Sequence, residues 1–284
     1  MEDVDAAAPA GGRRNLVTLH VGPVGAGRTI PIRIEAEPEP IRANVRAGDE
    51  PVPLTALMPL ARHLADQAAD RAARRAADRG ETVSCTKGCD ACCRYLVPLS
   101  EPEARTLAGE VLAAPPAVRD ALLDRFNRSA RALLAAQRDL GQAAREDSAH
   151  APDPGLWYTS LQLDCPLLHR SICSLYSRRP LSCRQHMVSS PPALCVGHRP
   201  DEGRLVPGEL NVSRALSLLA AEARGDHEPE AILLPVAIAW ACSDAAGPAP
   251  AMPAARAVER LAELLGAQAA AGLAEPTSAR NPAA

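Results

Sequence analysis

The sequence predicts a mainly α fold, in which a helical domain carries two cysteine-rich loops and a short β-hairpin precedes it. Three observations predict this fold. Apolar residues recur at helical spacing in several stretches after residue 53, an alternating pattern precedes them, and cysteines gather at 85–93 and 165–195. With 284 residues the chain can bury an ordinary core. We expect three parts: 1–52 (hairpin and Pro-rich linker), 53–243 (helical cysteine-cluster domain) and 244–284 (Pro/Ala linker, amphipathic helix and disordered tail).

Two short strands are predicted near the N-terminus. The segments "NLVTLHV" at 15–21 and "TIPIRIEAE" at 29–37 both alternate apolar and polar residues, and the Gly-rich "GPVGAGR" connects them. We therefore expect these two strands to pair as a hairpin. The Pro-rich stretch that ends at residue 53 then leads to the first helix.

The helices are predicted from apolar periodicity and from their start and stop signals. The first spans about 55–78 and ends before Gly80, and Ser100 with Glu103 forms a capping box that starts the next. A loop is expected at 141–156. Further helices are expected at 116–140, 209–223, 228–243 and around Val258, Leu261, Leu264 and Leu265. The face expected to be buried in 116–140 carries Val118, Leu122, Phe126, Leu133 and Leu140.

Charge and hydropathy exclude two classes of partner. The net charge is −3 and the arginines alternate with acidic residues, so their abundance indicates a GC-rich coding bias and no nucleic-acid partner. The N-terminus has no apolar signal-peptide core, and no run of about 18 apolar residues exists. We therefore expect a cytoplasmic protein without a membrane partner. Its oligomeric state is not predicted.

The cysteines are the residues from which chemistry is expected. In a reducing cytosol, clustered cysteines favour metal or redox chemistry over disulfides. An all-thiolate site needs four sulfurs that converge on one point, usually from two tight loops. The predicted metal ligands come from both groups: Cys85, Cys89, Cys92 and Cys93, then Cys165, Cys173, Cys183 and Cys195.

The number of metals and their identity stay open at this point. Eight thiols can form one site with spares, a two-metal site, or one iron–sulfur cluster with a redox-active remainder. The adjacent Cys92 and Cys93 point in different directions in most backbone conformations, which predicts different roles. Only Cys89 and Cys92 have the C-x2-C spacing of structural zinc sites, so the scattered spacing of the others favours iron, as an iron–sulfur cluster, over zinc.

Part of this cysteine spacing also occurs in another class of proteins. Cys85-x3-Cys89-x2-Cys92 is also the cluster spacing of radical S-adenosylmethionine enzymes. However, Ala91 stands where those enzymes usually have an aromatic residue, and no alternating series of strands and helices follows. The spacing alone is therefore weak support for that class.

With both groups considered, the chain resembles the YkgJ-like CxxCxxCC family of zinc- or iron-chelating domains. The matching segments are "CTKGCDACCRYLVPLSEPEA" at 85–104 and "CPLLHRSICSLYSRRPLSCRQHMVSSPPALC" at 165–195. The order of hairpin, helix and cluster also resembles one bacterial subgroup. The resemblance implies metal chelation but no established reaction. Because Tyr176, Arg179 and Arg184 lie within the family signature, we expect them beside the centre, where arginines would hydrogen-bond the sulfurs or offset their charge.

Other candidate residues have simpler interpretations. His169, His186 and His198 lie near the second cysteine group and are weaker candidates for a ligand. Cys195 is the most distant member of its group, and a place in the core is an alternative for it. Cys242 lies in the apolar stretch "VAIAWAC" and is predicted to pack in the core.

Three functions remain open from the sequence. The first is a cytoplasmic metalloprotein whose two loops enclose an iron–sulfur or an iron or zinc centre. The second is an enzyme that modifies a protein or peptide with that centre, for example by S-adenosylmethionine-dependent N-methylation, since a flagellin lysine N-methylase is similar in its cysteine motif. The third is a structural zinc module for a protein or peptide partner. No catalytic residue is predicted.

Overall fold

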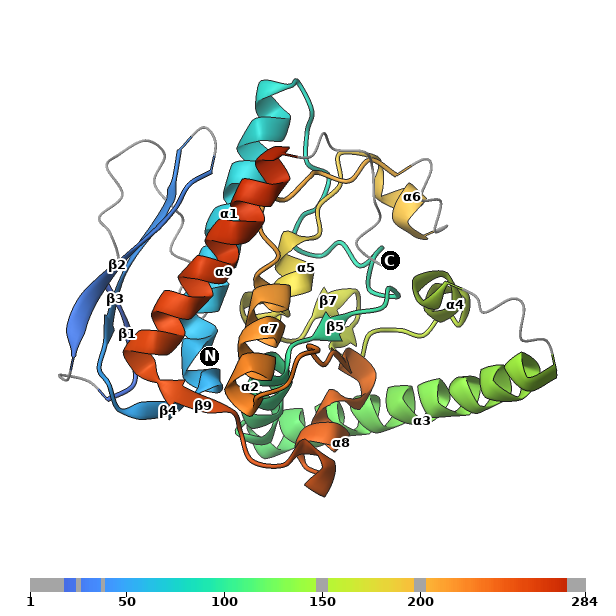
Figure 1. The fold of residues 1–284 in the computed structure, drawn as a ribbon. Coiled ribbons are helices and arrows are strands. Elements are labelled where there is room, and N and C mark those ends of the chain that lie inside the picture. Colours follow the sequence, from blue (N-terminus) through green and yellow to red (C-terminus); the bar gives the residue numbers. More distant parts are fainter. Residues whose placement is uncertain (1–17, 24–26, 37–38, 147–152, 197–202, 275–284) are drawn as a thin grey trace.

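The computed structural model describes residues 18–23, 27–36, 39–146, 153–196 and 203–274. Most of them are helical, as predicted for a mainly α fold. A small sheet forms one side of the molecule, two long helices pack on it, and the shorter elements that carry the cysteines lie on the other side of these helices (Figure 1).

The sheet has three strands in the order β1-β3-β2: β1 (Thr18–Val21), β2 (Arg28–Ile34) and β3 (Ile41–Ala47). β3 pairs antiparallel with β2 and parallel with β1. The predicted hairpin between the first two strands is therefore wrong, because β3 lies between them. The sequence of β3 also alternates buried and exposed residues, but it was assigned to the Pro-rich linker. Residues 15–17 and 37 of the predicted strands lie outside the described residues.

The larger core lies between this sheet and three helices: α1 (Met58–Asp78), α7 (Val212–Arg224) and α9 (Ala254–Ala274). All three helices are as predicted. A 3-10 turn (Leu54–Leu57) leads into α1, and Gly80 follows its end with φ +75°, a conformation that favours glycine. The members of this core that are buried to 1% exposure or less include Ile41, Val45, Leu57, Leu60, Leu64, Leu216, Val258, Leu261 and Leu265.

The predicted division into three parts stays a prediction. The larger core contains residues from all three parts, since Val45, Leu60 and Leu261 belong to the same cluster. A short antiparallel pair also joins two of them, between β4 (Pro51–Pro53) and β9 (Ala251–Pro253). The N-terminal strands and the C-terminal helix therefore pack together.

A second core is formed by α2 (Glu101–Leu112), the N-terminal part of α3 (Pro116–Glu146) and the segment after α7. The helix α3 is longer than predicted and includes part of the expected loop at 141–156, and α4 (Pro154–Ser160) includes more of it. Val118, in the first turn of α3, is 49% exposed, so its predicted burial is wrong. The rest of the predicted face is buried where its side chains are described, at Leu122, Phe126 and Leu133.

The helix predicted at 228–243 is wrong in its extent. Ile232–Leu233 form β8, which pairs with β5 (Pro98–Leu99), a 3-10 turn follows at Leu234–Val236, and only Ala237–Ala241 form an α-helix, α8. Pro235 removes a backbone donor and explains the break. Cys242 follows the end of α8 and is exposed, so its predicted place in the core is wrong.

Candidate metal centre

The first cysteine loop has no helix or strand between residues 81 and 97. Consecutive turns give it shape: Cys89 N–H donates to the Thr86 carbonyl (3.0 Å) and Cys93 N–H to that of Asp90 (2.9 Å). Gly88, with φ +95°, allows the first of these turns. All four cysteines of this loop are partly buried.

The second cysteine group lies on several short elements. Cys165 comes directly before a small hairpin of β6 (Leu168–His169) and β7 (Ile172–Cys173), in which Leu168 pairs with Cys173. Cys183 lies in α5 (Leu181–Gln185), and Cys195, the most buried of the group, in α6 (Pro192–Val196). The hairpin returns the chain within four residues and so places Cys165 near Cys173.

Backbone contacts join the two loops. Cys165 N–H donates to the Cys93 carbonyl at 2.8 Å, and Ser84 N–H donates to the Val188 carbonyl at 2.9 Å. The N–H of Val188 donates in turn to Cys85 Sγ at 3.4 Å. The structure therefore brings together two segments that are about 70 residues apart in the sequence.

The thiols lie near one another and largely out of water. Burial raises the pKa of Cys165 to about 12, and the neighbouring thiols of Cys173 and Cys92 add to the shift. A hydrogen bond with Cys93 raises the pKa of Cys92 most, followed by burial. Burial also raises the pKa of Cys183, again with Cys165 and Cys92 among the contributing neighbours. These thiols are therefore protonated at neutral pH unless a cation stabilises the thiolate.

The surroundings of several sulfurs suit a bound cation. Backbone N–H groups of Leu167 and Leu168 point at the Cys165 thiol, and that of Leu175 points at Cys173. Such donors stabilise thiolate, and thiolates are the ligands that zinc and iron accept in proteins. The donor set therefore fits a zinc or iron centre in its chemistry.

The sulfur atoms of these cysteines do not converge on a common point. Within the described part of the chain, no three His, Cys, Asp or Glu side chains are placed so that they could hold one ion together. Binding would therefore require the side chains of these loops to move toward each other.

Comparison with known proteins agrees with the cysteine pattern. Residues 84–201 match the CxxCxxCC family, whose description is "Putative zinc- or iron-chelating domain". This segment is similar to the CxxCxxCC family. It is hereafter the CxxCxxCC domain. Neither the curated proteins nor the solved structures that were searched contain a match to the chain.

Two of the three signature residues lie together in the CxxCxxCC domain. The Arg179 guanidinium stacks over the Tyr176 ring, with 4.2 Å between Cζ and the ring centroid, and Lys87 Nζ lies 5.8 Å from the same centroid. The pKa values of Cys85, Cys92 and Cys173 are all raised, and the charge of Arg179 opposes this rise at each of them. The main cause of the rise is burial at Cys85 and Cys173 and the hydrogen bond with Cys93 at Cys92.

Arg184 is placed differently. Its buried guanidinium holds both carboxylate oxygens of Asp66 on α1 (2.6 and 2.8 Å) and donates to the Arg179 carbonyl at 3.1 Å. These contacts tie α5 to α1. A direct role of Arg184 beside a bound metal stays a prediction.

The three histidine candidates differ in their surroundings. Burial lowers the pKa of His186, and its Nε2 atom is buried without a hydrogen-bond partner among the described residues. Its ring meets the edge of Tyr95, whose hydroxyl donates to the Cys195 carbonyl at 2.8 Å. His169 is exposed, and His198 lies outside the described residues.

Sequence reasoning missed the second role of Glu103. The predicted capping box with Ser100 is present, but the buried carboxylate also accepts a hydrogen bond from Leu181 N–H at 2.9 Å and one from the Ser213 hydroxyl. Glu103 therefore joins the first turns of α2, α5 and α7, and fixes the helix that carries Cys183. Only the capping box was visible in the sequence, because the other donors come from segments far along the chain.

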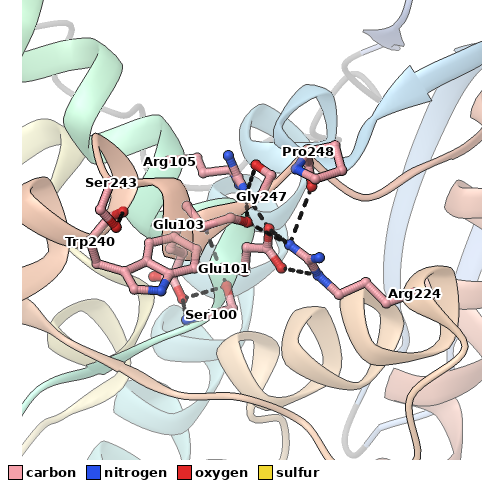
Figure 2. A network of polar contacts seen from close by, with 10 residues as sticks. Ser100, Glu101, Glu103, Arg105, Arg224, Trp240, Ser243, Gly247 and Pro248 are labelled. Atoms are coloured by element: carbon pink, nitrogen blue, oxygen red, sulfur yellow. Dashed lines mark hydrogen bonds and ion pairs between the residues drawn. The ribbon is translucent and has the colours of Figure 1, made fainter.

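Figure 2 shows the polar network around this end of α2. Beside Glu103, the buried Glu101 accepts from Arg105 (Nε, 2.8 Å) and from Arg224 of α7 (Nε, 2.7 Å). Arg105 also stacks on the Trp240 ring, with Cζ 5.3 Å from the centroid. The network joins the first turn of α2 to the end of α7 and to the segment that follows α8.

Proposed function

We propose that the CxxCxxCC domain binds zinc or iron through thiolates that come from both cysteine loops. The observation that carries this proposal is the contact between the loops. The Cys165 N–H bonds the Cys93 carbonyl at 2.8 Å, and Cys92 shifts the pKa of thiols in both loops. A cation between the loops would receive ligands from each, and it would offset the cost of ionising buried thiols.

The iron–sulfur form of this centre is the first candidate. The seven- to eleven-residue spacing of the second group is unlike a zinc knuckle. Backbone N–H groups that point at sulfur, as at Cys165 and Cys173, also tune the potential of such clusters. When bound, the centre would supply electron transfer or a scaffold for the loops. The cytoplasm is the compartment proposed for it, because free thiols persist there. Within the described ranges, no helix is long and apolar enough to cross a membrane.

The test is anaerobic purification of the full chain from iron-supplemented cells, followed by metal and sulfide analysis and an absorption spectrum. Brown protein with about four irons and four sulfides per chain would support the iron–sulfur form. Colourless protein with zinc would support a zinc centre. Cys89→Ala and Cys183→Ala should each lose metal, whereas Cys242→Ala is the matched control in an exposed cysteine. Full metal content in both test variants would contradict a centre built from both loops.

A structural role for the metal is the second candidate, and one observation favours it. Ala91 is the one buried residue among residues 81–97, and this segment contains no helix or strand. Burial of apolar surface therefore contributes little to the free energy that stabilises the conformation of this loop. A metal would supply the missing stabilisation and present the loop to a protein or peptide partner. Loss of partner binding on chelation, without any redox change, would support this role over an electron-transfer role.

A modifying enzyme is the remaining alternative. A cavity of about 260 Å³ lies beside α1 and is lined by Glu39, Arg71, Arg74, Ala77 and Asp78. None of the clustered cysteines lines it, so this cavity does not by itself provide a substrate pocket at the proposed centre. S-adenosylmethionine binding to the purified, metal-loaded protein is the measurement that would favour this function.

A further inference from the structure

The three-stranded sheet has one covered side and one side exposed to solvent. The helices α1 and α9 pack on the covered side, where alternate residues of β2 and β3 are buried (Figure 1). The residues between them point to the other side, which is hereafter the outer face of the sheet. Its residues include His20, Pro31, Arg33, Arg42, Asn44 and Arg46, and all of these are exposed except Asn44, which is partly buried.

The strand register places the cationic residues of the outer face in two groups. Arg33 of β2 lies directly opposite Arg42 of β3. Arg46, further along β3, lies directly opposite His20 of β1. Asn44 lies between the two arginines of β3, which are four residues apart and therefore about 13 Å apart along the strand. Like charges that face each other destabilise a sheet, so the pair of Arg33 and Arg42 is an arrangement that a bound anion would stabilise.

The positive charge of the outer face is only partly offset by the chain itself. Glu35 accepts from Arg33 Nη2 at 3.3 Å, and the charge of Arg42 also acts on this carboxylate. Within the ranges that the structure describes, neither Arg42 nor Arg46 has an acidic side chain as an ion-pair partner. Because the whole chain has a net charge of −3, the outer face has the opposite sign to the molecule that carries it.

The chemistry of the outer face favours carboxylates as its ligands. The arginine guanidinium binds both carboxylates and phosphates through paired hydrogen bonds. The aromatic residues of the chain (two Trp, three Tyr and one Phe) all lie after residue 90, so the three strands have no ring on which a nucleic-acid base could stack. The negative net charge also opposes the approach of a polyanion as highly charged as a nucleic acid.

We propose that the outer face of the sheet binds an extended, acidic segment of a partner protein. Acidic side chains four positions apart on an extended segment point to the same side and lie about 13 Å apart, which matches the separation of Arg42 and Arg46. The open edge of β2 is a poorer site, because Pro31 has no N–H to donate to an added strand. This inference does not depend on the proposed function, since α1 and α9 lie between the sheet and the cysteine segments (Figure 1).

Peptide binding to the full chain, measured by fluorescence anisotropy, tests the inference. The probe is a labelled peptide with glutamates spaced four positions apart, and its matched control has glutamine in place of each glutamate. The wild-type chain should bind the glutamate peptide at low salt and lose affinity as salt rises toward about 0.3 M, because exposed charges are then screened. The glutamine peptide should bind at least about tenfold more weakly.

Replacing the two arginines of β3 should remove most of the binding. The double variant Arg42→Gln and Arg46→Gln should lose at least about tenfold in affinity. The control double variant, Arg119→Gln and Arg128→Gln on α3, removes the same charge from another surface and should stay within about twofold of the wild type. Arg42→Gln removes a like charge opposite Arg33, so it should not lower the midpoint of urea unfolding. If it does, Arg46→Gln alone tests the site, with an expected loss of several-fold.

Three results would overturn the proposal. The first is no binding of the glutamate peptide at low salt, and the second is equal affinity in the wild type and in the folded variant of Arg42 and Arg46. The third concerns a labelled single-stranded oligothymidine of the same length. Tighter binding of this oligonucleotide than of the peptide, with the same dependence on Arg42 and Arg46, would make the outer face a nucleic-acid site.

Discussion

Leu60 and Leu64 of α1 are completely buried in a core that α1 shares with the sheet, α7 and α9, whereas residues 81–97 bury only Ala91. The first region is stabilised by apolar area removed from water, at about 25 cal/mol per Å². The cysteine loops instead rely on turns, on backbone contacts such as Cys165 to Cys93, and on their thiols. From this difference we expect the sheet region to fold without a ligand and the cysteine loops to need one.

The largest expected effect is that of removing the metal. Chelation should increase hydrogen exchange of backbone amides in 81–97 and 165–195 by at least tenfold, because structural zinc contributes about 10–16 kcal/mol in small peptides and the loops have little else. Amides of β2 and β3 should keep their protection. Mass-spectrometric exchange before and after chelation measures both. Equal loss in the sheet would contradict the comparison.

A cavity in the larger core should affect stability but not metal content. Leu64→Ala should lower the free energy of unfolding by about 2–5 kcal/mol, since Leu64 is fully buried. Urea unfolding measures this change, and elemental analysis should find the wild-type metal content. Leu134→Ala, at a 50% exposed leucine on α3, is the control and should change stability by less than about 0.5 kcal/mol. Loss of metal in folded Leu64→Ala protein would show that the two regions are coupled.

Replacing Glu103 tests the contact between the two regions. Glu103→Ala leaves the N–H of Leu181 and the hydroxyl of Ser213 without their buried acceptor, which should cost about 1–3 kcal/mol. Because α5 carries Cys183, the variant should also release metal faster to a chelator. Glu103→Gln keeps an acceptor oxygen and should lose less. Unchanged release in Glu103→Ala would mean that α5 is held by its other contacts.

Alkaline pH should destabilise the metal-free protein. An unfolded cysteine has a pKa of about 9.0, whereas burial raises that of Cys165 to about 12 in the folded chain. Between these values the unfolded state binds fewer protons, so stability falls as pH rises from about 9 to 12 and is unaffected below this range. Urea midpoints of reduced, metal-free protein measure the fall, which should be shallower in Cys165→Ser. Metal-loaded protein, whose thiols are already deprotonated, should not show it.

The smallest effect is expected on the surface of α3. Asp124 and Arg128 form an exposed ion pair one turn apart, with side chains about two-thirds exposed. Arg128→Ala should change the free energy of unfolding by about 0.3–0.5 kcal/mol, and high salt should remove the difference. A change above about 1 kcal/mol in urea unfolding would mean that this part of α3 has a partner.

The sequence predicted the elements that local patterns determine. Helical periodicity located α1, α7 and α9, and the spacing of Ser100 and Glu103 predicted the start of α2. The pairing of the strands was not predictable in the same way, because alternation of apolar and polar residues indicates a strand but not its partner. Cys242 was misplaced because the predicted helix is replaced by β8, a 3-10 turn and the short α8, and Cys242 lies just after the last residue of α8.

At the candidate site, the sequence identified the eight cysteines but not their arrangement. Their spacing indicated two groups by position in the chain. The structure divides them in another way, since Cys195 lies with the first loop through Val188 and Tyr95. This grouping depends on contacts between segments about 100 residues apart, and spacing contains no information about them. The same holds for Asp66, which accepts hydrogen bonds from Arg184, a residue 118 positions further along the chain.

The parallel pairing of β1 with β3 has a consequence for how molecules meet each other. β1 covers the backbone N–H and C=O groups of β3 from Asn44 to Ala47. Without β1, these groups would form an open edge beside the apolar side chain of Val45, which is a template for a strand from another molecule. We therefore expect a chain shortened to begin at residue 22 to self-associate more readily than the full chain, because it exposes this edge of β3.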